Sequence, residues 1–379
     1  MKYVALVLAL LSSATISALA QPPEITPSRI VDINGAGVPD VTITEMSRCN
    51  SSTPPFDATA TKTYVTDAFG FFSWPAPGAP GGGSQCANSV SFVFTLSKEG
   101  YTFTRVNFTY KRNPSFPGQP PASDTRLPLI YASTAPVWTS VSAASFTANE
   151  NGALTTGMIA AGFGSGLAET TESAGAVLPE ILANRRILVR DSAGVEKAAR
   201  LFFASPTQLN YLMPEGLQNG AMVVKLMSSA NELIKVDLGS FESVAPGVFT
   251  ANFDGAGVPA AIVTRVKPGN VQTVEPVAQI DVAQSRFVPL PIDLGPDTEF
   301  VVLTLFGSGW RQFGTLSNTK VTIGGVDCPV EYVGLQPTFD GTDQINARLP
   351  RALISKGEVD VKVSFADRYF ANTVKLNFK

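Results

Sequence analysis

Hydrophobic and polar residues alternate along much of this chain, and runs with the period of an α-helix are rare. Residues 89–97, SVSFVFTLS, would place Val90, Phe92, Phe94 and Leu96 on one side of an extended backbone. A period of two predicts a β-strand with one buried face. This segment is therefore expected to be a half-buried strand.

Alternation returns late in the chain, and turn-forming residues separate the predicted strands. The run PAPGAPGGGSQC at 75–86 is too rich in proline and glycine for a core. Only VLPEILANRR, at 177–186, resembles a short helical turn. Many short strands and frequent turns predict an all-β protein with immunoglobulin-like sandwiches. The other alternating positions are Met222, Val224 and Leu226, then Val359, Val361, Val363 and Phe365, and finally Val374, Leu376 and Phe378.

Two short motifs occur twice in the same order. Phe-Gly-Ser-Gly stands at 163–166 and again at 306–309, and Gln-x-Asn stands at 208–210 and again at 344–346. In both copies a proline, a glycine and an alternating strand follow the Gln-x-Asn motif. Conserved order with drifting loop lengths predicts two tandem copies of one β-sandwich unit.

These signals divide the chain into five segments. Residues 1–20 have a lysine at position 2, an apolar run and a small-residue site ending at Ala20, which predicts a cleaved secretory signal peptide. A first β-sandwich is expected over 21–130. A linker is expected over 131–137, after a proline-rich run. The two repeated units, expected to be Ig-like, would occupy 138–249 and 250–379.

The charge and hydropathy of the chain limit which partners and which cellular compartment are expected. The chain carries 28 Lys and Arg against 31 Asp and Glu, for a net charge of −3, and no basic run. Nucleic acid and anionic membrane surfaces are therefore not expected as partners. After the leader, no apolar stretch is long enough for a transmembrane helix. The mature protein is expected outside the cytoplasm, either extracellular or periplasmic.

The N-terminal segment carries motifs of a known family. These are SRIVDINGAGVPDVTI, YVTDAFGFFSWP and LSKEGYTF, which supply an opening strand, a Thr-Asp-x-x-Gly-x-Phe hairpin and a late Gly-Tyr. In that order they resemble the bacterial carboxypeptidase-regulatory-like, or transthyretin-like, domain, although Ser28 stands where glycine is usual. The resemblance implies an accessory β-sandwich of the prealbumin type. It implies no peptidase, because no zinc peptidase signature is present.

Residues 138–379 resemble a C-terminal module of secreted proteins from soil-dwelling acidobacteria. The resemblance rests on FGSGLA, ASPTQLNYLMPEG, APGVFTANFDGAG and FDGTDQINARLPRALISKGEVDV. It implies secretion and β-sandwich folds. It implies no activity, because fold alone does not carry function.

Three cysteines occur, at 49, 86 and 328. In an oxidising compartment a pair with one cysteine left over is expected. Cys49 and Cys86 share the N-terminal region, so a disulfide between them is favoured, with Cys328 a buried free thiol. The alternative is three reduced, buried cysteines.

Histidine is absent from the whole chain. Its absence excludes a Ser-His-Asp or Cys-His site and any histidine-ligated zinc within this chain. A hydrolase would have to use carboxylates alone, such as Asp340 with Asp343 or Glu169 with Glu172, and these pairs are expected in loops. We therefore expect no enzyme, no catalytic residue and no cofactor.

Calcium requires only oxygen ligands, so it remains an alternative. Asp254, Asp340 and Asp343 stand in the glycine-containing stretches NFDGAG and FDGTDQ. No EF-hand loop is present, and Asp-Gly also makes tight turns without a metal. No metal site is expected, and these three aspartates are the weak candidates.

The duplicated amides and two aromatic residues are the remaining candidates. Because alternate side chains of a strand point the same way, Gln208 lies beside Asn210, and Gln344 lies beside Asn346. Such a pair can fix the fold or meet a ligand, and its duplication favours a structural role. The ligand candidates are Trp74 and Tyr101, aromatic residues that could stack on a sugar ring.

The expected function follows from these exclusions. The sequence favours a secreted, non-catalytic bacterial protein with an adhesion, binding or scaffold role. A carbohydrate-binding accessory protein and a carboxylate-only hydrolase are the alternatives. The expected partner is a polysaccharide or a cell-surface protein.

Overall fold

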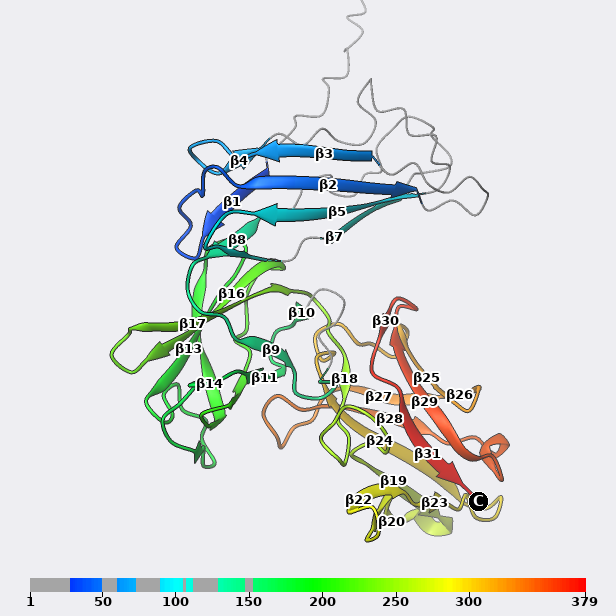
Figure 1. The fold of residues 1–379 in the computed structure, drawn as a ribbon. Coiled ribbons are helices and arrows are strands. Elements are labelled where there is room, and N and C mark those ends of the chain that lie inside the picture. Colours follow the sequence, from blue (N-terminus) through cyan, green and yellow to red (C-terminus); the bar gives the residue numbers. More distant parts are fainter. Residues whose placement is uncertain (1–27, 50–59, 73–88, 105–106, 112–128, 147–152) are drawn as a thin grey trace, which may run out of the picture.

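The structure is a computed structural model that describes residues 28–49, 60–72, 89–104, 107–111, 129–146 and 153–379. It is all-β, as predicted, and is built from several sheets (Figure 1). Among the described residues the helical elements are two single 3-10 turns, η1 (Pro268–Asn270) and η2 (Arg351–Leu353). Three large apolar cores divide the strands into N-terminal, middle and C-terminal units.

The N-terminal unit has two four-stranded sheets, ordered β4-β1-β8-β6 and β3-β2-β5-β7. Ile30, Ile43, Phe72, Phe94 and Ile130 form its core between them. The strands are β1 (Ser28–Asp32), β2 (Thr42–Cys49), β3 (Ala60–Val65), β4 (Phe71–Phe72), β5 (Ser89–Ser97), β6 (Thr102–Phe103), β7 (Asn107–Lys111) and β8 (Ile130–Ser133).

The middle unit is one nine-stranded sheet folded around its core, ordered β10-β17-β16-β13-β14-β15-β11-β9, with β12 on β14. The long strand β14 pairs first with β13 and then with β15, so it serves both halves. The strands are β9 (Thr139–Ser142), β10 (Ala153–Leu154), β11 (Ile159–Phe163), β12 (Glu172–Ser173), β13 (Arg185–Arg190), β14 (Glu196–Ala204), β15 (Gln208–Leu212), β16 (Gly220–Ser228) and β17 (Leu233–Phe241).

The C-terminal unit has two six-stranded sheets and a separate hairpin, β21–β22. One sheet is ordered β20-β19-β24-β28-β27 with β18 on β24, and the other β23-β31-β29-β25-β26 with β30 on β29. The strands are β18 (Gly247–Val248), β19 (Ala261–Lys267), β20 (Val271–Pro276), β21 (Ala278–Asp281), β22 (Arg286–Pro289), β23 (Pro291–Ile292), β24 (Phe300–Ser308), β25 (Thr319–Ile323), β26 (Val326–Cys328), β27 (Val330–Leu335), β28 (Asp343–Arg348), β29 (Gly357–Phe365), β30 (Tyr369–Phe370) and β31 (Val374–Phe378).

The middle and C-terminal units pair their strands in the same way. β9, β10, β11, β13, β15, β16 and β17 of the middle unit correspond to β18, β23, β24, β25, β28, β29 and β31. Even the parallel pair is repeated, because β10 runs parallel to β17 and β23 runs parallel to β31. The duplicated sequence motifs therefore mark a duplicated strand order.

The two copies are not identical, because among the described residues β12 on β14 and β30 on β29 each occur in one copy alone. The C-terminal copy inserts β19 to β22 before β23, and β19 and β20 widen the sheet next to β24. The strand equivalent to β14 is divided into β26 and β27 on either side of Pro329. Proline has no N–H to donate to a ladder, which explains why the long strand of the middle unit becomes two here.

The predicted helical turn at 177–186 is wrong. Leu182 and Arg185 exchange both backbone hydrogen bonds, at 3.0 and 2.9 Å, around Ala183 and Asn184. Both central residues have positive φ, of 49° and 59°. The segment is thus a tight two-residue turn that leads into β13.

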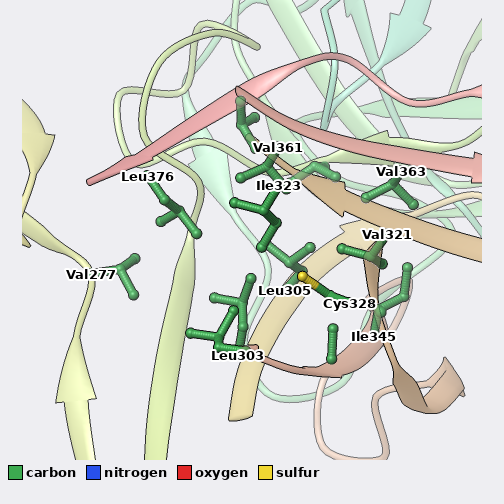
Figure 2. Close-up of a cluster of buried hydrophobic side chains, with 14 of the residues drawn as sticks. Val277, Leu303, Leu305, Val321, Ile323, Cys328, Ile345, Val361, Val363 and Leu376 are labelled. Atoms are coloured by element: carbon green, nitrogen blue, oxygen red, sulfur yellow. The ribbon is translucent and has the colours of Figure 1, made fainter. Parts of the chain in front are cut away.

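Alternation predicts the core strands of both copies correctly. Val361, Val363 and Phe365 of β29 are buried in the C-terminal core, which Figure 2 shows packed around Cys328. In β16, however, the intervening Ala221 and Val223 are buried as well. They pack with Val31, Tyr131 and Val236 in a fourth cluster that joins the N-terminal and middle units. β16 is therefore buried on both faces.

Hydrogen bonds strengthen the junction between the N-terminal and middle units. Tyr131 donates from Oη to the backbone oxygen of Asp191 at 2.7 Å. The Asp191 side chain is fully buried and accepts from the backbone N–H groups of Val195 and Gln218, both at 2.8 Å. Arg190 donates to the backbone oxygen of Asn34 at 3.3 Å. A turn of the middle unit is thereby fixed against the N-terminal unit.

The described residues contain no helix that is long and apolar enough to span a membrane.

Candidate functional site

The duplicated amides occupy equivalent positions on β15 and β28. In the middle unit Gln208 donates from Nε2 to Asn210 Oδ1 at 2.9 Å. In the C-terminal unit Gln344 donates to Asn346 in the same way at 2.8 Å. All four residues are half-buried, while the residue between each pair is fully buried in the core. Each pair therefore lies on the outer face of its sheet.

An aromatic side chain stands opposite the asparagine in both copies. Phe203 of β14 pairs with Asn210, and Tyr332 of β27 pairs with Asn346. Each aromatic residue follows a bulge, between Leu201 and Phe203 in β14 and between Val330 and Tyr332 in β27. Directly opposed residues of neighbouring strands project to the same face, so ring and amides are neighbours. We call each group of Gln, Asn and opposed ring an amide–aromatic site.

A second ring borders each amide–aromatic site. Phe163 of the first Phe-Gly-Ser-Gly motif pairs with Gln208, and Phe306 of the second pairs with Gln344. Phe163 is 37 % exposed and lies 6.3 Å from Phe146 between ring centroids. The two repeated motifs of the sequence are thus cross-strand neighbours in the structure.

Each amide pair keeps unused polar groups. The Gln-to-Asn bond occupies the glutamine N–H₂ group and the asparagine oxygen. Among the described residues no hydrogen bond is made by the glutamine Oε1 or the asparagine Nδ2, and neither belongs to the buried unpartnered atoms. One acceptor and one donor group therefore face solvent side by side in each copy.

The second Phe-Gly-Ser-Gly motif joins the middle and C-terminal units. Ser308 is fully buried. Its Oγ accepts from the backbone N–H of Ile159 at 3.0 Å and donates to the backbone oxygen of Gly341 at 2.7 Å. The equivalent Ser165 of the middle unit is exposed. One motif therefore has two uses, an open loop in the first copy and a junction in the second.

Asp343, a calcium and hydrolase candidate, is a buried structural acid. Its Oδ1 accepts from Arg311 Nε at 2.6 Å, and its Oδ2 accepts from the backbone N–H of Trp310 at 2.8 Å. Burial raises the pKa of the Asp343 carboxyl, and the Arg311 charge opposes that shift. Both carboxylate oxygens are thus occupied by protein donors.

The other acidic candidates are also paired with protein groups. Asp340 forms an ion pair with Arg200 of the middle unit at 3.1 Å. Asp254 accepts from the backbone N–H of Ala256 at 3.0 Å. In the part of the chain that the structure describes, no three His, Cys, Asp or Glu residues form a group that could hold a metal ion. The structure does not gather the three calcium candidates into one site.

Glu169 and Glu172, the second pair of hydrolase candidates, each contact a different residue of the protein. Glu169 lies 3.6 Å from Arg185. Glu172 accepts the backbone N–H of Ala183 at 2.8 Å. Both carboxylates thus contact the segment that begins β13.

The predicted aromatic and cysteine positions have different outcomes. Trp74 and Cys86 lie outside the described residues, as does the side chain of Cys49, so the disulfide stays a prediction. Tyr101 packs partly against the N-terminal core, and Lys98 Nζ lies 5.5 Å from its ring centroid. Cys328 is a free, buried cysteine, as predicted.

One more acid lies beside the core of the middle unit. Asp237 of β17 accepts the backbone N–H of Ser140 at 2.7 Å. Burial raises the pKa of the Asp237 carboxyl to about 6, and the hydrogen bonds from Ser140 oppose the shift. Burial also raises the pKa of the neighbouring Tyr211 phenol. The Asp237 carboxyl therefore changes its charge at a pH above the usual range of an aspartate.

Sequence analysis found the amides of the site but missed the opposed rings. Phe203 and Tyr332 become equivalent only when the bulges of β14 and β27 are known. A third repeated motif, Phe-Thr-Ala-Asn, stands at 146–149 and again at 249–252. It is a further sequence signal that aligns the two copies upstream of the Phe-Gly-Ser-Gly motif.

Comparison with known proteins does not extend this description. No protein-family model matches the chain, and no curated protein matches it either.

Proposed function

We propose that the chain is a secreted, non-catalytic bacterial protein whose β-sandwich units form a fixed scaffold for adhesion or binding outside the cell. The observation that carries the proposal is the junction made by Ser308, which bonds both Ile159 and Gly341. Asp340 and Asp343, which the sequence offers as chemical groups, are engaged in ion pairs at or next to this junction. The side chains of Ser308, Asp340 and Asp343 are used for contacts within the protein, which favours a structural role for them over a catalytic one.

The N-terminal junction supports the same proposal. Its apolar cluster includes Tyr131 and Val236, and Tyr131 is only 1 % exposed. Buried apolar contact combined with satisfied hydrogen bonds opposes independent motion of two units. Three units held in this way would present their loops and outer faces at constant spacing, which is useful to a scaffold.

Secretion is the cellular part of the proposal. It rests on the leader at 1–20 and on the resemblance of residues 138–379 to a C-terminal module of secreted bacterial proteins. We expect the mature protein outside the cytoplasm with Gln21 as its first residue. Fractionation and mass spectrometry of the intact protein test this, and a full-length chain in the cytoplasm would contradict it.

Retention on surfaces tests the binding role. Residues 21–379 are mixed with insoluble polysaccharides and with whole bacterial cells, and bound protein is measured against concentration. A Cβ added at Gly341 would overlap Ile159 Cγ1, so Gly341→Val opens the second junction. Gly175→Val is the matched control, because nothing lies near a Cβ there.

We expect saturable retention of the unmodified protein and of Gly175→Val. Gly341→Val should be retained about 10-fold more weakly, because units that move freely lose simultaneous engagement. No retention on any polysaccharide or cell surface would overturn the proposed function. If Gly341→Val is retained as strongly as the unmodified protein, the fixed arrangement of the units is not needed for binding, and that part of the proposal is wrong.

A further inference from the structure

We propose that the amide–aromatic site of the C-terminal unit binds a neutral polysaccharide chain, and that the middle unit carries a second copy of this site. The site consists of Tyr332, Gln344 and Asn346 on the outer face of the sheet, and its counterpart consists of Phe203, Gln208 and Asn210. This inference rests on the proposed function and assigns it a ligand class and a place.

Tyr332 supplies an aromatic surface that is held in place. Its Oη donates to the backbone oxygen of Leu335 at 2.5 Å. A Cβ at Gly334 would lie only 3.2 Å from that Oη, so the ring extends along β27 over the glycine. Gly334 pairs with Gln344, and Tyr332 is 39 % exposed. The ring therefore lies beside the amides with part of its surface open, an arrangement on which a sugar ring can stack.

The amides supply the matching polar groups. Gln344 Oε1 can accept and Asn346 Nδ2 can donate, and their mutual bond at 2.8 Å holds both side chains in place. Neighbouring hydroxyl groups of a sugar both donate and accept, so one ring can satisfy an adjacent acceptor and donor together. A pre-ordered pair loses little side-chain entropy when the ligand binds.

The charge of the surrounding face favours a neutral ligand. Arg348 lies on the same face, two positions after Asn346, and pairs with Glu331 at 2.9 Å. Its guanidinium also stacks over the Phe300 ring, 4.1 Å from the centroid. The Arg348 cation is thus already paired with a carboxylate, so this pair supplies no net charge that would select a charged polymer.

The position of the site within the sheet argues against an extended peptide. β28 lies between β24 and β27 and forms ladders with both. Its backbone groups are therefore used, and a peptide strand cannot be added to it, because strand addition needs an open edge. Recognition by the amides of β28 must therefore come from side chains, which fits a sugar polymer. β27, which carries Tyr332, is the last strand in the order of this sheet, and competition by an extended peptide tests addition at that edge.

The second site increases the expected strength of binding to a polymer. Phe203, Gln208 and Asn210 have the same cross-strand arrangement, with Phe163 exposed beside them. The hydrogen bond from the Ile159 backbone N–H to Ser308 Oγ and the ion pair of Arg200 with Asp340 join the two units. Two weak sites at constant spacing bind one long chain more tightly than either site alone.

Calorimetric titration with soluble neutral oligosaccharides tests the inference, using β-glucan, xylan, mannan and chitin fragments. The variants are Tyr332→Ala, Phe203→Ala and the double variant. Phe370→Ala is the control, because Phe370 is 64 % exposed on β30 in the other sheet of the same unit. Tyr332→Phe keeps the ring and separates stacking from loss of the local fold.

We expect two binding sites in the unmodified protein, one in each single variant and none in the double variant. Phe370→Ala should bind as the unmodified protein does, and Tyr332→Phe within about 3-fold of it, because it keeps the stacking surface. Unchanged binding by the double variant, or competition by an unrelated extended peptide, would overturn the inference. If the double variant is still retained on surfaces, the inference is wrong and the proposed function stands. If the unmodified protein is not retained on any surface, both the inference and the proposed function are wrong.

Discussion

Gly162 is the residue on which the packing of Trp138 depends most directly. A Cβ built at Gly162 would overlap the six-membered ring of Trp138, whose side chain is buried in the middle core. Gly162→Ala should lower the free energy of unfolding by about 1–3 kcal/mol, the usual cost of overpacking. Gly175→Ala, with nothing near its Cβ, should change it by less than about 0.5 kcal/mol. Chemical denaturation measures both, and equal stability of the two variants would contradict the packing described.

Asp237 makes the stability of the protein depend on pH. Its folded-state pKa of about 6 is above the ordinary value of 3.8, so the folded state holds its proton more tightly. This contribution is fully present below about pH 4 and is lost as the pH rises to about 6, so the free energy of unfolding falls across that interval. The fall is no more than about 3 kcal/mol, because each pKa unit corresponds to about 1.4 kcal/mol.

Asp237→Asn should remove this fall, because asparagine does not ionise. Asp367→Asn, at an exposed position, is the control and should retain the fall. Denaturation between pH 4 and pH 7 provides the measurement. A profile of Asp237→Asn that still declines as the unmodified protein does would assign the pH dependence to another group.

At the scale of elements, Asp343 links β28 to the segment after β24. Arg311 is paired with it at 2.6 Å, and the Asp343 side chain has no exposure. Asp343→Ala would leave the Arg311 charge without its partner and should lower the free energy of unfolding by about 3–5 kcal/mol. Asp327→Ala removes a pair with Lys320 in which both side chains are largely exposed, and should change the stability far less than Asp343→Ala does. Similar losses in both variants, measured by thermal unfolding, would contradict the buried role of Asp343.

Strand prediction succeeded where one face of a strand meets one core. Val361 and Val363 lie on either side of the exposed Lys362, and the structure buries both valines as expected. It was incomplete for β16, where Val223 is buried by a different unit, because contacts between units leave no period in a local sequence. It failed at Ala183 and Asn184, because the positive φ values of this turn use residues other than glycine.

At the scale of the whole molecule, the sequence predicted that the unit is repeated, but it did not predict the different structural roles of the repeated motifs in the two copies. The duplicated Gln-x-Asn and Phe-Gly-Ser-Gly motifs predicted two copies, and the strand order agrees. That Ser308 would join two units while Ser165 stays exposed depends on how the copies stack. The opposed rings depend on bulges in β14 and β27, which shift the register by a residue that no alternation pattern reports.

The central claim is that the duplicated amides face outward to a ligand rather than hold the fold together. At the level of sequence, the duplication of these amides favours a structural role, with ligand binding as the alternative. In the structure the two amide side chains of each pair bond only to each other among the described residues, at 2.9 and 2.8 Å. The fold should therefore tolerate their loss.

The measurement that tests this claim most directly is the free energy of unfolding of a variant with Gln208, Asn210, Gln344 and Asn346 all replaced by alanine. Both partners of each bond are removed together, so no buried group is left unpaired. We expect a change of less than about 1 kcal/mol for each pair, typical of outward-facing residues. A loss of more than about 3 kcal/mol for each pair would show that the amides hold the fold and would contradict the account.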